Sequence, residues 1–168
     1  MRQTVPIRSR NKISGMGLLE LLLALTVIAI LLVMATRYYK SAKESQRIGE
    51  AVSMMSTIFR GGADYSIAHN HTYTGISLKA LADNGDIPGS FCGNRVTCPG
   101  LNPWNSTITV GETNPAGGYI VKMFGVPEVT CDNAAAIINT SLSNAPVGNS
   151  KALCDNKTAI VAVVYEVS

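Results

Sequence analysis

The stretch from Met16 to Ala35 reads MGLLELLLALTVIAILLVMA, twenty residues with a single charge, at Glu20. A helix of this length spans about 30 Å, the thickness of the hydrocarbon core of a bilayer. Basic residues precede the stretch at close range, so the positive-inside rule places the N-terminus in the cytoplasm and the chain after Thr36 outside. The sequence therefore predicts a membrane-spanning helix followed by an exported segment.

The composition limits what the remainder can be. The chain has 168 residues, enough for one domain, and with 46% hydrophobic and 15% charged residues it is not a disordered chain. Its net charge of +3 comes from the first fifteen residues, which carry four basic side chains and no acidic one. The rest has ten basic and eleven acidic residues. We therefore predict no nucleic-acid partner.

Glu20 is the exception within the apolar stretch. A carboxylate inside a membrane segment costs several kcal/mol, so it is expected there only with a partner or a function. One interpretation is an interfacial side chain that reaches the headgroups from the cytoplasmic edge of the stretch. The other interpretation depends on the residues around it.

Those residues, from Lys12 to Leu23, read KISGMGLLELLL. They resemble the N-terminus of type IV prepilins and pseudopilins, which have a short basic leader ending in Gly, an apolar first mature residue, Glu at the fifth mature position and an unbroken apolar helix. Gly15, Met16 and Glu20 match this pattern position by position. The resemblance implies that a membrane prepilin peptidase cuts between Gly15 and Met16, and that the new amine of Met16 is methylated.

The same resemblance implies partners and a destination. Subunits of this family polymerise through their N-terminal helices with the help of pilus assembly machinery, and Glu20 of one copy would pair with the Met16 ammonium of a neighbour. The precursor would lie in the bacterial inner membrane, and the mature chain in an extracellular pilus fibre. Two alternatives stay open from the residues alone: a secretory signal peptide cut after Ala35, and an uncut signal anchor.

A second helical segment is expected to continue the first. Arg37 to Arg60 contains no Pro, and the apolar positions Ile48, Val52, Met55 and Phe59 recur at spacings of four, three and four. This spacing places them on one face of an amphipathic helix. The pair Gly61-Gly62 is predicted to end it.

The rest of the chain predicts a small α+β head in which a helix lies across an antiparallel sheet. We expect short helices over 77–82 and 133–138, the second with Asp132 as N-cap. Strands are expected over 106–110, 119–124 and 158–167, the first two as a hairpin. The last strand is apolar on both faces, which favours a central position or cover on both sides. The predicted organisation is a cleaved leader (1–15), a membrane and assembly helix (16–36), its amphipathic continuation (37–61) and a globular head (62–168).

Four cysteines fall in the exported part, and an even count in an oxidising compartment indicates two disulfides. Of the three possible pairings we favour Cys92–Cys98, which closes a tight loop before Pro99, and Cys131–Cys154, which holds the turn-rich segment 139–153 against the last strand. The order of elements in the head looks like that of type IVb pilins. In that family the region bounded by the second disulfide corresponds to the D-region, which forms subunit contacts.

The sequence contains no arrangement of residues typical of an enzyme, a metal site or a cofactor site. His69 and His71 have no acidic or thiol partner nearby in the sequence, so a solvated loop is favoured over a metal site. Two classes of function remain. The first is a structural pilus subunit, with a minor pilin or a type II secretion pseudopilin as variants. The second is a membrane-tethered periplasmic binding or adhesion module that acts without polymerisation.

Overall fold

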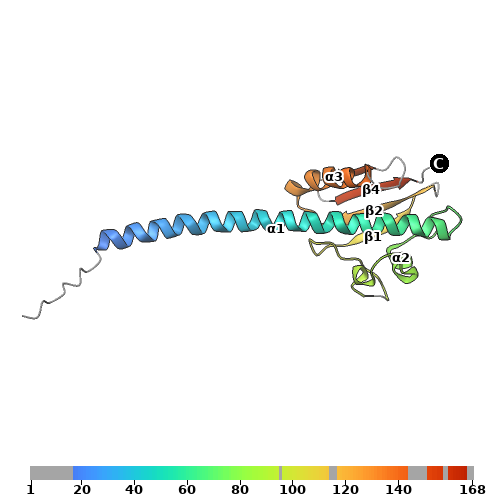
Figure 1. Ribbon diagram of the computed structural model, residues 1–168, viewed down its shortest axis with the longest axis horizontal. Helices are drawn as coiled ribbons and strands as arrows, with labels where there is room; N and C mark the ends of the chain where they lie inside the picture. Colours follow the sequence, from blue (N-terminus) through green and yellow to red (C-terminus); the bar gives the residue numbers. More distant parts are fainter. Residues whose placement is uncertain (1–16, 95, 114–116, 144–150, 157–158, 166–168) are drawn as a thin grey trace, which may run out of the picture. The chain divides into compact units, whose positions relative to one another are not determined.

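The computed structural model describes residues 17–94, 96–113, 117–143, 151–156 and 159–165. The chain divides into two compact units, Met1–Ser41 and Ala42–Ser168. Helix α1 (Leu18–Ala68) contributes to both units. The remaining elements belong to the second unit and are, in chain order, α2 (Leu78–Asn84), the 3-10 turn η1 (Gly89–Cys92), β1 (Ile108–Glu112), β2 (Gly118–Phe124), α3 (Glu128–Ser143), β3 (Lys151–Asp155) and β4 (Ala159–Tyr165) (Figure 1).

The four described strands form one antiparallel sheet in the order β1-β2-β4-β3. The hairpin of β1 and β2 agrees with the prediction, and Val121 on β2 pairs with Val110 on one side and Ala162 on the other. The strand β4 lies between β2 and β3, which confirms its predicted central position. The edge strand β3 was not predicted from the sequence.

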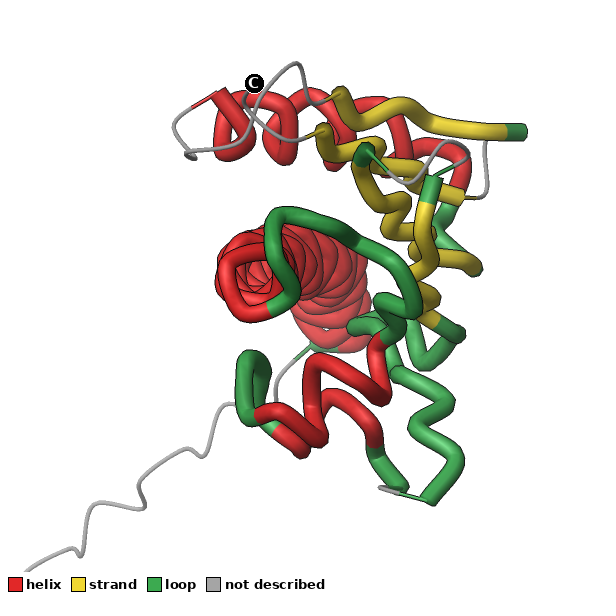
Figure 2. Tube along the Cα trace, turned by 90° about the vertical axis from the view of Figure 1, so that its right-hand side faces the viewer, coloured by secondary structure: helices red, strands yellow, loops and turns green. Residues whose placement is uncertain are grey.

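The second unit has its core between the C-terminal part of α1 and one face of this sheet. Figure 2 shows that part of α1 with the strands beside it, α3 on one side and α2 with η1 on the other. Alternate residues of β2 and β4 point into the core: Tyr119, Val121, Met123, Ile160, Ala162 and Val164 are all buried. The predicted helical stripe faces them, since Ile48, Met55 and Phe59 are buried and Val52 is half-buried. The α+β fold class is confirmed.

The prediction that Gly61-Gly62 ends the helix is wrong, because α1 runs on to Ala68. Both glycines are buried where α1 touches its neighbours. A Cβ on Gly62 would lie 2.4 Å from Cζ of Tyr119, and one on Gly61 would lie 2.7 Å from Cγ2 of Ile87. The glycines therefore permit close approach within a helix and do not terminate it.

Helix α3 is longer than predicted and begins earlier. It spans Glu128–Ser143, so Asp132 lies inside the helix and is not its N-cap. The first turn follows Pro127, whose carbonyl accepts hydrogen bonds from the amides of Thr130 and Cys131. Proline suits a helix start because it has no amide hydrogen to leave unpaired.

The first predicted strand begins two residues late in the structure. The side chain of Asn102 explains the shift, since its Oδ1 accepts hydrogen bonds from the amides of Trp104 and Ser106, both at 3.0 Å. These bonds hold 102–106 in a turn, a common role for Asn. By contrast, α2 matches its prediction, with Ser77 as N-cap and Gly85 in the left-handed region at φ 84°.

Candidate membrane and assembly helix

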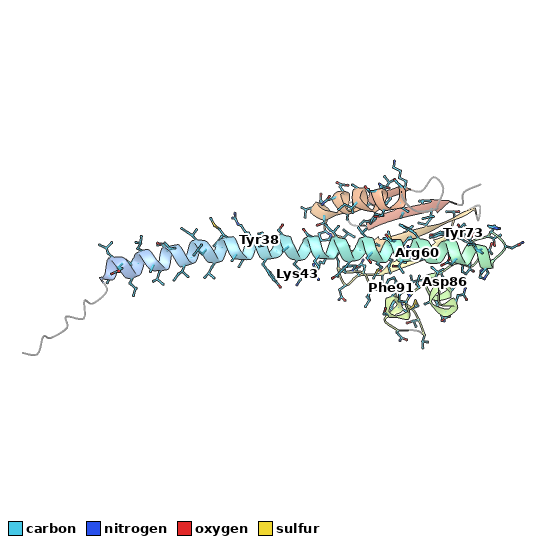
Figure 3. All side chains as sticks on the ribbon, viewed as in Figure 1. Tyr38, Lys43, Arg60, Tyr73, Asp86 and Phe91 are labelled. Atoms are coloured by element: carbon cyan, nitrogen blue, oxygen red, sulfur yellow. A yellow bond between two sulfur atoms is a disulfide. The ribbon has the colours of Figure 1, made fainter. Side chains whose placement is uncertain are left out.

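The part of α1 in the first unit, Leu18–Ser41, has every side chain exposed. It is also the most apolar part of the chain, with a mean hydropathy of 2.8 over its best window and none of that window buried. Leu18 is 78% exposed and Met34 is 62% exposed, and Figure 3 shows the side chains of this segment projecting away from the helix. An apolar surface of this size on one protein marks contact with lipid or with other protein.

Glu20 lies in the first turn of α1 and is exposed. Its amide donates a hydrogen bond of 2.9 Å to the carbonyl of Gly17. The N-terminal end of a helix favours a negative charge, which suits a carboxylate in this turn. Across the described residues Gly17–Thr36 the sequence offers no basic side chain to pair with it. The predicted cleavage and methylation positions, Gly15 and Met16, lie outside the described residues.

In the second unit, Glu44 forms a polar junction that the sequence analysis did not predict. Its Oε1 accepts hydrogen bonds from Nε1 of Trp104 at 2.8 Å and from Oγ1 of Thr130 at 3.0 Å. Oε2 lies 3.7 Å from a guanidinium nitrogen of Arg47. The carboxylate thus joins α1 to the loop after η1 and to the first turn of α3. These partners are 60 and 86 residues away, so no local pattern could have indicated them.

The cysteines form the two pairs that the sequence analysis favoured. Cys92 is bonded to Cys98, and Cys131 is bonded to Cys154, with sequence separations of 6 and 23 residues. The second disulfide ties α3 to the edge strand β3. The disulfide thus joins two consecutive elements of the head, and the expectation that it would attach to the last strand is wrong because Cys154 lies on β3.

His69, which the sequence analysis singled out, packs against its own helix. The ring of His69 stacks on Tyr65 with centroids 3.8 Å apart, and its Nδ1 lies 2.9 Å from the Tyr65 carbonyl. Among the described residues there is no group of three or more His, Cys, Asp and Glu side chains that could hold a metal.

Burial raises the pKa of Tyr119 far above its ordinary value of 10.0, with a smaller contribution from Tyr73.

An exposed apolar helix with one carboxylate, followed by a disulfide-bonded α+β head, defines a type IV pilin-like structural subunit, and the comparisons agree. The model of the prokaryotic N-terminal methylation motif matches residues 10–36. The model of the Bundlin family matches residues 40–163, which is most of the chain. The chain belongs to this family of type IV prepilins. The pilin family is structural, not enzymatic.

One curated relative has a different description. The chain is 32% identical over 89 residues to alpha-1,4-glucan:maltose-1-phosphate maltosyltransferase 1 of Streptomyces coelicolor. The matched region covers 53% of this chain but only 12% of that protein. The similarity therefore concerns a small part of a much longer protein.

Proposed function

We propose that the mature chain polymerises into a type IV pilus through its N-terminal helices, after removal of residues 1–15 and methylation of Met16. The precursor lies in the inner membrane with its N-terminus in the cytoplasm, and the mature chain ends in an extracellular fibre. Its partners are further copies of itself, a prepilin peptidase and pilus assembly machinery. No catalytic step is assigned to the chain.

The observation that carries this proposal is Glu20, the single charge within a fully exposed apolar helix. In a membrane monomer the carboxylate can stay near the headgroups at modest cost. In a bundle of such helices water is excluded, so the carboxylate must meet a positive charge. Cleavage after Gly15 creates one, the ammonium of Met16, five residues from Glu20 counting both ends. The Met16 ammonium of one copy would then pair with the Glu20 carboxylate of a neighbouring copy.

The pair is expected to set the register of the helices more than their net stability. Removing one member of a buried ion pair strands the other charge, and this penalty is larger than the net worth of the pair. Misaligned helices would leave the carboxylate unpaired in the same way. Glu20 would therefore select one stagger between neighbouring subunits.

Two variants of Glu20 test the proposal. Glu20→Gln keeps the size and removes the charge, and Glu20→Leu also removes the polarity and makes the helix a better membrane span. Both should be made, processed and retained in the inner membrane, yet give few or no fibres. The measurement is the ratio of sheared surface fibre to total cellular protein.

Thr26→Val supplies a matched control. Thr26 is the polar residue between Glu20 and Thr36, and its hydroxyl donates to the carbonyl of Leu23 in the same helix. Its removal should leave fibre yield unchanged. An unchanged yield in Glu20→Leu would show that the pair is dispensable and would overturn the pairing mechanism. Absence of fibres from cells that make the wild-type protein would instead favour a membrane-tethered module that acts without polymerising.

A further inference from the structure

The apolar part of α1 ends in a short polar segment, Arg37-Tyr38-Tyr39-Lys40, all within the first unit. From Leu18 to Thr36 the helix is nineteen residues long, or about 28 Å, which matches the hydrocarbon thickness of a bilayer. The four residues therefore fall where a membrane-spanning helix would leave the hydrocarbon. Tyr38, labelled in Figure 3, is 80% exposed and Tyr39 is 66% exposed.

Helix geometry arranges these four side chains as a collar. Successive residues are rotated by about 100°, so four in a row surround the helix. Arg37 and Lys40 are three apart and share one side, and the two tyrosines occupy the other. The side chain of Arg37 borders a shallow surface hollow with Ala29, Ile30, Val33 and Met34. An arginine next to an apolar helix face can lay its aliphatic stem along that face and keep its charge at the polar boundary.

The collar is electrostatically uncompensated. Between Leu21 and Lys43 the chain has three basic residues and no acidic one. Within the described part of the chain neither Arg37 nor Lys40 is joined to a carboxylate. In the proposed topology these cations lie on the exported side, where basic residues close to a span are disfavoured. Their position therefore calls for an anionic partner at the membrane surface.

We propose that this collar binds the headgroups of anionic phospholipids in the outer leaflet of the membrane that holds the monomer. The inference rests on the proposed function, since it assumes that α1 spans a membrane. The two cations bind the lipid phosphate, and the tyrosine rings sit at headgroup level, where amphipathic rings are favoured. A net negative lipid is preferred over a zwitterionic one, because the zwitterion carries its own compensating cation.

Lipid selectivity of the monomer tests the proposal. The full mature chain is placed in phosphatidylcholine vesicles with trace spin-labelled phosphatidylglycerol or spin-labelled phosphatidylcholine. The fraction of each label that is motionally restricted beside the protein gives a relative affinity. The wild type should prefer the anionic label several-fold, since one cation near the surface contributes about fivefold. The double variant Arg37→Gln/Lys40→Gln should lower the ratio to about one.

Lys122→Gln/Lys151→Gln is the matched control, because it removes two exposed lysines from the sheet of the head and leaves the collar intact. It should keep the wild-type ratio. Soluble glycerol phosphate added to the vesicles should not lower the ratio; if it does, the collar binds free phosphate groups and the lipid proposal is overturned. A wild-type ratio of one, or an unchanged ratio in the double variant at residues 37 and 40, also overturns it.

The experiment separates this inference from the proposed function. The vesicles hold monomers, so a failure to form fibres in cells leaves the lipid ratio unaffected. Loss of selectivity, in turn, leaves polymerisation through Glu20 standing. If neither label is restricted, α1 does not span the bilayer, and both the membrane topology and the lipid site are overturned together.

Discussion

At Gly62 the helix α1 comes so close to strand β2 that a single methyl group would not fit. A Cβ there would lie 2.4 Å from Cζ and 2.5 Å from the hydroxyl of Tyr119. The same tyrosine donates a hydrogen bond of 3.2 Å to the carbonyl of Phe59, one turn earlier in α1. A ring seated on a glycine and bonded to the helix backbone fixes the distance between helix and sheet.

We expect Gly62→Ala to destabilise the head although alanine is the better helix former. Displacing a buried ring costs about 1–3 kcal/mol, more than the gain of about 1 kcal/mol in helix propensity. The matched control is Gly49→Ala, because a Cβ on Gly49 would meet nothing within 4 Å. It should stabilise by about 1 kcal/mol. Urea unfolding of the mature chain in detergent, followed by the fluorescence of Trp104, measures both; equal effects would contradict this account.

Tyr119 also predicts a pH dependence. Its pKa is raised by burial above the ordinary value of 10.0, so above that pH the unfolded state loses the proton while the folded state keeps it. Stability should therefore fall as the pH rises above 10.0. Tyr119→Phe should cost about 1 kcal/mol at neutral pH, through loss of the hydrogen bond.

Above pH 10.0 the relative stability of wild type and Tyr119→Phe should change. The advantage of wild type over Tyr119→Phe should shrink by about 1.4 kcal/mol per pH unit and then reverse. Urea unfolding at a series of alkaline pH values measures it. Tyr39→Phe, at an exposed position, should show the wild-type slope. A constant difference between wild type and Tyr119→Phe would mean that the phenol ionises equally in both states.

At the scale of elements, the edge strand β3 depends on a side chain of α3. Ala152 pairs with Ala162 of β4 on one side. On the other side, the backbone amide of Ala152 donates a 2.6 Å hydrogen bond to Oδ1 of Asn139. Nδ2 of Asn139 in turn donates a 2.7 Å hydrogen bond to the carbonyl of Ala152. The amide of Asn139 thus takes the place of a fifth strand at this position. An edge closed in this way does not offer these groups to a second chain.

Asn139→Ala should leave both groups of Ala152 without their side-chain partner. We expect a loss of about 2 kcal/mol in the free energy of unfolding and faster hydrogen exchange at the Ala152 amide. Asn133→Ala is the same substitution at an exposed position of the same helix. It should be neutral or slightly stabilising, because alanine is the better helix former. Unchanged exchange at Ala152 in Asn139→Ala would refute the role of the side chain.

The sequence predicts those elements that are set by a local pattern of residues and misses those that depend on contacts with distant residues. The stripe of Ile48, Val52, Met55 and Phe59 and the apolar run of β4 are local patterns, and both were interpreted correctly. The strand β3 was missed because its outward residues, Leu153 among them, are exposed. It is held by β4 on one side and by Asn139 and Cys131 of α3. Gly61-Gly62 was interpreted wrongly because these glycines make room for Tyr119 and Ile87, which lie far along the chain.

The two glutamates described in the candidate site also differ in how far the sequence reveals them. Glu20 stands out in the sequence because a lone charge in an apolar run is unusual without any knowledge of the fold. Glu44 does not, because its partners Trp104 and Thr130 become neighbours only when the head has folded. The described partners of Glu44 are Trp104, Thr130 and Arg47, and only Arg47 is close to it in the sequence.

At the scale of the whole molecule, the two units are stabilised by different means. The second unit contains its own core, sheet and disulfides. The first is an apolar helix with no buried residue among those described, so it needs a bilayer or other helices around it. Cleavage of such a chain would leave its apolar helix in place only if the cut preceded that helix. The position of the cleavage therefore decides what the molecule can do.

We expect the mature chain to begin at Met16 and to carry one added methyl group on its amine. Cleavage at this point keeps the whole apolar helix and creates the ammonium that Glu20 requires. Cleavage after Ala35 would instead release the second unit without its anchor, and the chain would begin at Thr36. Intact mass spectrometry of the protein from its native membrane separates the two outcomes, and a start at Thr36 would rule out polymerisation through α1.

Variants of two nearby glycines locate the determinant of cleavage. Gly15→Ala should slow processing and accumulate the precursor, because a glycine before the scissile bond keeps the backbone accessible and disfavours helix at that point. Gly17→Ala adds the same methyl group two residues downstream, where a Cβ meets nothing within 4 Å, and should be processed normally. Normal processing of both variants would show that the peptidase does not need glycine at position 15. Slow processing of both would instead mean that helix propensity across the junction, and not the residue before the cut, controls the reaction.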